Sequence, residues 1–243
     1  MTSTHTAPLS LGLAGVLVAE THLSSVNGAE GRLILRGHSI EALGGHHPFE
    51  AVAHLLLKGS LPGPRALKSF TQELAEARAA AFSQLPELSH ALENTSAMGA
   101  LRGALGQLSA PDGGGDALGV IGAAAVVAAA WVRGRQGLEA IAPDPNLGHG
   151  ADYLYMATGV RDAARGAAID AYLCTVMDHG LNASTFTARV IASTGSDLVS
   201  SVCGAIGALK GPLPGGAPGP VLDMLDAVGT PETASRWVEG ELG

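Results

Sequence analysis

The 243-residue chain carries a formal net charge of −8, and hydrophobic residues make up 47% of it against 15% charged residues. This composition can bury a sizeable core and argues against global disorder. The negative charge would repel a phosphate backbone or an anionic membrane surface, so we expect no nucleic-acid partner and no membrane partner.

Residues 1–40 are expected to form an N-terminal arm that contains a β-hairpin. An apolar run begins at Val16, and the run from Leu33 to Leu35 would form the returning strand. Between them, Asn27–Gly28 favours a two-residue turn because both residues tolerate positive φ. No basic region followed by a long apolar run precedes this arm, so we expect no signal peptide.

After Pro48 the spacing of apolar residues changes to three and four, which predicts helices. The second of these helices has Leu67, Phe70, Leu74 and Ala77 as its apolar stripe. The expected fold class is therefore all-α, a helical bundle with a small N-terminal β-hairpin. The helices are predicted over about 48–59, 64–81, 96–108, 118–135, 148–158, 163–178, 183–210, 221–228 and 231–242.

One predicted helix contains a run of apolar residues from Ala117 to Trp131. This run is short for a membrane span and rich in Ala and Gly, which favours a buried core helix. At its end, Arg133 and Arg135 would complement the helix dipole at its C-terminus.

The titratable side chains suggest no metal centre. Cys174 and Cys203 have no CxxC partner, so neither a zinc site nor a disulfide is expected, and a reducing cytoplasmic location fits. His46–His47 precedes Pro48 in what we expect to be an exposed loop. His149 and Asp152 are spaced i, i+3 on a predicted helix, and we expect a polar pair at or near the surface.

Three stretches carry a family resemblance, in residues 16–59, 131–159 and 178–217. The first holds ETHL, GRLILRG and FEAVAHLLLKG, the second RGRQGLEAIAPDPNLGHGADYLYMATG, and the third DHGLNASTFTARVIASTGSDLVSSVCGAIGALKGPLPGGA. Their motifs, order and spacing resemble the citrate synthase family, in which citrate and 2-methylcitrate synthases share these motifs. The resemblance implies that residues 1–243 form the family's large helical domain, and that the family's small domain is absent from this chain.

The family condenses acetyl-CoA with oxaloacetate, and a base, an enol-stabilising donor and carboxylate-binding cations serve that chemistry. By resemblance, His179, Asn182 and Ser184 match the substrate-binding D-H-x-x-N-A-S motif. Pro214 stands where the family has the catalytic His of its G-P-x-H-G-G-A motif, and proline has neither a donor nor a titratable group. The resemblance therefore predicts that no catalytic residue is intact. Acetyl-CoA would be a co-substrate of an active form, and no other cofactor is expected.

Three hypotheses for function follow. The first is a catalytically incomplete homologue that acts by association, as a homodimer or as a heterodimer with a full-length relative. The second is a working citrate synthase whose small domain comes from another chain or from residues beyond the present sequence. The third is a non-catalytic module that binds a dicarboxylate such as oxaloacetate or citrate, or a CoA-type ligand, near His179.

Overall fold

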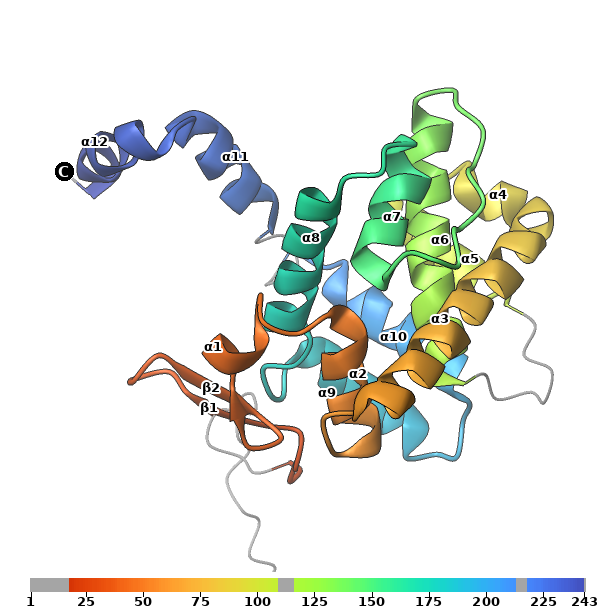
Figure 1. Ribbon diagram of the computed structural model, residues 1–243, viewed down its shortest axis with the longest axis horizontal. Helices are drawn as coiled ribbons and strands as arrows, with labels where there is room; N and C mark the ends of the chain where they lie inside the picture. Colours follow the sequence, from red (N-terminus) through yellow and green to blue (C-terminus); the bar gives the residue numbers. More distant parts are fainter. Residues whose placement is uncertain (1–17, 109–115, 213–217, 243) are drawn as a thin grey trace, which may run out of the picture.

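The computed structural model describes residues 18–108, 116–212 and 218–242, and it is a helical body with one small sheet (Figure 1). The expected fold class is thereby confirmed. The strands are β1 (Ser24–Asn27), β2 (Arg32–Leu35) and β3 (His38–Ser39). The helices are α1 (Ile40–Leu43), α2 (Phe49–Lys58), α3 (Pro64–Gln84), the 3-10 turn η1 (Leu85–Leu88), α4 (Ser89–Leu92), α5 (Ala97–Leu105), α6 (Ala117–Arg135), α7 (His149–Thr158), α8 (Ala163–Val176), α9 (Ala183–Ala192), α10 (Leu198–Leu209), α11 (Pro218–Val228) and α12 (Pro231–Leu242).

The first hairpin differs from the expected one in its turn. β1 and β2 pair antiparallel with Asn27 opposite Arg32, so residues 28–31 form a four-residue connection. The expected two-residue turn at Asn27–Gly28 is therefore wrong. Asn27 instead uses its side-chain oxygen, which accepts a hydrogen bond from the backbone N–H of Glu30 at 3.2 Å. This is the local side-chain bond that makes Asn common in turns.

Along the sequence, the first strand starts later than expected, and a third strand follows the expected pair. Val16 lies outside the described residues, Val18 is in no strand, and the first strand starts at Ser24. A second antiparallel pair, with Leu35 opposite His38, adds β3 and gives the strand order β1-β2-β3. Strands of two to four residues carry too little periodic pattern to be placed from sequence alone.

A small core joins this sheet to the helical body. The buried side chains of Leu35, Leu43, Val52, Leu55 and Cys174 pack together, which connects β2, α1, α2 and α8. Burial raises the pKa of the Cys174 thiol to about 12, so the thiol stays protonated. Both cysteines are free, as expected.

Helix α6 lies in the middle of the helical body, against α3, α5 and α7 (Figure 1). Among the described residues, it alone is long and apolar enough to qualify as a candidate membrane span. Packing within the protein accounts for this apolar composition, because a helix surrounded by other helices needs no polar face toward water. At Gly122 the helices approach so closely that a Cβ atom would lie 2.9 Å from the backbone of Ala77 and Arg78 in α3.

The predicted helix over 183–210 is wrong as a single element. The chain breaks between α9 and α10, where Gly195 has a φ of +79°. Asp197 then starts the next helix, because its carboxylate accepts a hydrogen bond from the backbone N–H of Ser200 at 2.8 Å. The two helices pack against each other, and α10 also contacts α5.

Helices α11 and α12 extend away from the rest of the molecule and pack mainly on each other (Figure 1). Their outward position leaves large apolar side chains of α11 exposed, among them Val221, Leu222 and Leu225.

Candidate functional site

The side chain of His179 is exposed on the turn that joins α8 to α9. Its neighbour Asp178 shapes this turn by accepting a hydrogen bond from the backbone N–H of Gly180 at 3.0 Å. Gly180 has a φ of +89°, which favours glycine there. The turn rests against the hairpin, because a Cβ atom on Gly180 would lie 3.5 Å from a methyl carbon of Val26 in β1.

The structure brings the other two predicted substrate-binding residues to the same turn. Asn182 is the N-cap of α9, and its side-chain oxygen accepts a hydrogen bond from the backbone N–H of Thr185 at 2.9 Å. Ser184 follows as the second residue of α9 and is half-buried. Asn182 thus has a structural task that sequence motifs do not reveal, and its capping oxygen is already engaged. Substrate binding by His179, Asn182 and Ser184 remains a prediction.

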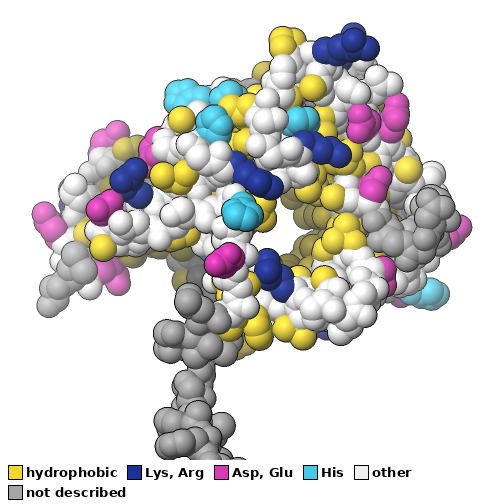
Figure 2. Space-filling model, turned by 90° about the horizontal axis from the view of Figure 1, so that it is seen from below, with side chains coloured by type: hydrophobic (Ala, Val, Ile, Leu, Met, Phe, Trp, Pro, Cys, Tyr) yellow, Lys and Arg dark blue, Asp and Glu magenta, His cyan; other side chains and the backbone are white. Residues whose placement is uncertain are grey.

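Pro214, at the position expected for the catalytic His, lies outside the described residues. Seen from below the orientation of Figure 1, the molecule has a central hollow with hydrophobic side chains inside and Lys, Arg, His, Asp and Glu side chains around it (Figure 2).

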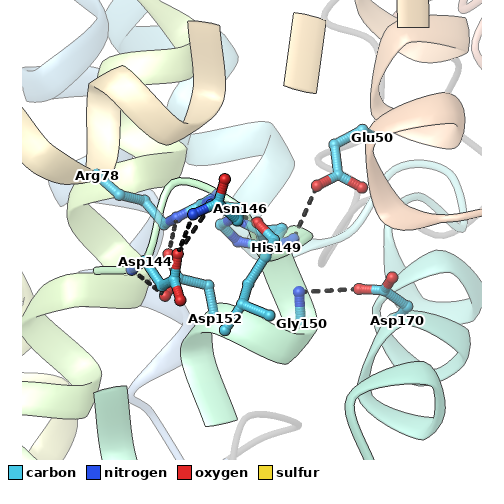
Figure 3. A network of polar contacts seen from close by, with 9 residues as sticks. Glu50, Arg78, Asp144, Asn146, His149, Gly150, Asp152 and Asp170 are labelled. Carbon is cyan, nitrogen blue, oxygen red and sulfur yellow. Dashed lines mark hydrogen bonds and ion pairs between the residues drawn. The ribbon is translucent and has the colours of Figure 1, made fainter. Parts of the chain in front are cut away.

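A buried polar network lies in the helical body, at the start of α7 (Figure 3). Arg78 of α3 is fully buried, and its Nε lies 2.5 Å from the carboxylate of Asp152. Its other nitrogens contact Nδ1 of His149 at 3.2 Å and donate to the backbone carbonyl of Leu147 at 3.1 Å. The expectation that His149 and Asp152 form a pair near the surface is therefore wrong, because each instead binds the buried guanidinium of Arg78.

Two further carboxylates cap helix α7 from neighbouring helices (Figure 3). Glu50 of α2 accepts a hydrogen bond from the backbone N–H of His149 at 2.7 Å, and Asp170 of α8 accepts one from Gly150 at 2.9 Å. The N-cap residue Gly148 has no side chain to offer these donors. The two acidic side chains therefore satisfy the free N–H groups and the positive end of the helix dipole.

The charges of this network follow from its burial. Burial, followed by the neighbouring charge of Arg78, lowers the pKa of His149 to about 3, so its imidazole is neutral at physiological pH. Since Arg78 can only donate, Nδ1 of His149 is the acceptor and Nε2 carries the proton. Burial also raises the pKa of Glu50 and of Asp170. All these groups have partners within the protein, which indicates a structural network.

The histidines outside this network were considered as ligands of a metal centre. Within the described ranges, no group of three or more His, Cys, Asp or Glu side chains has metal-binding geometry. His46 is exposed, in agreement with the expected loop, and His47 is half-buried. Arg133 and Arg135 lie in the last turn of α6, as expected for cations at a helix C-terminus.

Comparisons with known proteins bear on the whole chain. A family model described as the C-terminal domain of citrate synthase matches residues 12–243. The 2-methylcitrate synthase of Mycobacterium tuberculosis is 37% identical over 240 residues, which cover 95% of this chain and 61% of that protein. The citrate synthase of Haloferax volcanii is 38% identical over 250 residues, covering 96% of this chain and 66% of the relative.

Solved structures give the same picture. Citrate synthase from Thermotoga maritima superposes with a TM-score of 0.82 at 34% identity, covering 96% of this chain and 64% of that one. Citrate synthase from Pyrobaculum aerophilum gives a TM-score of 0.79 at 35% identity, covering 93% of this chain and 61% of that one. The chain thus spans 61–66% of the length of these relatives.

Proposed function

Because the chain belongs to the citrate synthase family, we propose that it acts by association, with a second copy or with a full-length member of the family. In this proposal it does not complete the condensation of acetyl-CoA with oxaloacetate. The observation that carries the proposal is Pro214. Proline cannot donate a hydrogen bond to an enol oxygen and has no group to titrate. Losing such a donor typically lowers the rate by a factor of about 10²–10³.

The surface of α9 and α10 supports the association. No residue of α9 is buried, although most of its side chains are apolar or small. Val190 in α9 is 50% exposed, and Leu209 in α10 is 47% exposed. Apolar side chains left exposed on a pair of helices are typical of surfaces that bind another protein. Two free cysteines agree with a cytoplasmic location, which we also propose.

We expect the purified chain to sediment as a dimer at micromolar concentration, or to form a heterodimer when it is mixed with a full-length relative. Val190→Glu should weaken either association at least about tenfold, because it places a charge in the apolar contact. Val160→Glu is the matched control, since Val160 is similarly exposed at 54% but lies between α7 and α8. The proposal would be contradicted if the chain stayed monomeric both alone and when mixed with a full-length relative. Equal effects of the two variants on association would also count against it.

A second candidate function, a working citrate synthase completed by another chain, is favoured by its relatives, which include a 2-methylcitrate synthase and a citrate synthase. An assay of oxaloacetate-dependent thiol release from acetyl-CoA separates the two. We expect no release above background from the chain alone or from its homodimer. Release that disappears in His179→Ala would establish the second function and overturn ours. Thermal stabilisation by millimolar oxaloacetate without turnover would instead identify a ligand-binding module.

A further inference from the structure

Arg36 has a backbone conformation that large side chains rarely adopt. Its φ is +48°, and no other residue except glycine has a positive φ in the described part of the chain. Arg36 and Gly37 form the two-residue turn between β2 and β3, and both have positive φ. Such turns favour Asn, Asp or Gly at the first position, because the Cβ atom of other residues crowds the backbone. An arginine here needs a compensating interaction.

The side chain supplies that interaction at the end of a neighbouring helix. Nη2 of Arg36 donates to the backbone carbonyl of Leu56 at 3.4 Å, in the last turn of α2. The last carbonyls of a helix have no partner within it and form the negative end of its dipole, so a cation is favourable there. Nε of Arg36 and the hydroxyl of Ser24 are also buried and bond to none of the described residues. The guanidinium is thus inserted between the sheet and α2.

The anchored hairpin in turn contacts the turn that carries His179. The backbone N–H of Arg36 donates to the carbonyl of Leu23 at 2.8 Å, which ties the β2–β3 turn to the residue before β1. Further along β1, Val26 lies against Gly180, two residues before the N-cap of α9. The hairpin therefore bridges the C-terminal end of α2 and the entry to α9.

We propose that Arg36 is a positioning residue, which anchors the hairpin to the C-terminal end of α2 and thereby holds the turn that carries His179. This extends the proposed function, because the same turn sets the start of α9, which belongs to the association surface. The anchoring itself is a property of the single chain, so it can be tested without any partner.

Arg36→Asn tests the proposal by the sign of its effect. Asparagine suits the backbone of this turn better than arginine, so a purely local effect would raise the thermal midpoint. We expect a decrease of about 2–4 °C instead, because the contact with α2 is lost. Arg32→Asn is the matched control on the same hairpin, since Arg32 is exposed and its ion-pair partner among the described residues is Glu30, also at the surface. That control should leave the midpoint within about 1 °C.

Hydrogen exchange then distinguishes positioning from general loss of stability. In Arg36→Asn, the amides of Gly180 and Thr185 should exchange about tenfold faster, while the amides of α6 exchange as before. A raised thermal midpoint, or unchanged exchange at Gly180 and Thr185, would overturn the proposal. These measurements use the monomer at low concentration, whereas Val190→Glu tests association separately. The positioning role of Arg36 and the association can therefore be disproved independently of each other.

Discussion

Arg78→Met is expected to lower the free energy of unfolding by about 3–5 kcal/mol, because it leaves a buried carboxylate without its cation. The side chains of Arg78 and Asp152 are both fully inaccessible to solvent, so water cannot replace the lost partner. The carbonyl of Leu147 and Nδ1 of His149 would lose a donor as well. Methionine fills much of the volume of arginine, so an empty cavity contributes little to this loss.

Urea denaturation of three variants tests this account. Arg78→Met combined with Asp152→Asn should be more stable than Arg78→Met alone, since the amide removes the unpaired charge. The asparagine oxygen can still accept the hydrogen bond that Asp144 N–H now donates to Asp152 at 2.8 Å. Arg165→Met is the control for an exposed pair and should cost no more than about 1 kcal/mol. An Arg78→Met cost as small as that of the control would show that the buried pair does not stabilise the fold.

The helices that form this network could be predicted from apolar periodicity, but the network could not. The stripe Leu67, Phe70, Leu74 and Ala77 placed the start of α3 correctly, but α3 ends at Gln84, three residues later than predicted. Arg78 continues the same face, four residues after Leu74, which was the available signal of its burial. Charged residues are rarely buried without a partner, and the partner Asp152 is 74 residues away. Only the folded structure brings the two together.

The break between α9 and α10 had a clearer local signal. Gly195 followed by Asp197 resembles the end of one helix and the capped start of the next. Apolar residues on both sides obscured it, so one helix was expected over 183–210. By contrast, the clustering of His179, Asn182 and Ser184 needed no tertiary information, because six consecutive residues form one turn and one helix start.

Gly122→Ala is expected to destabilise the protein by about 1–3 kcal/mol, against the intrinsic preference of a helix interior for alanine. The added Cβ would lie 2.9 Å from the backbone of Ala77 and Arg78, where the obstacle is main chain and cannot rotate away. α3 and α6 would have to separate. That movement would also shift Arg78 relative to Asp152, so the cost of the substitution should depend on the buried ion pair.

Gly134→Ala is the matched control within α6, because nothing lies within 4 Å of a Cβ atom at that position. There the helix preference acts alone, and we expect a gain of up to about 1 kcal/mol. Urea denaturation should therefore give opposite signs for the same chemical change in one helix. A gain at both positions would mean that α3 and α6 tolerate separation at their crossing. The close approach at Gly122 would then not be what holds the guanidinium of Arg78 beside Asp152.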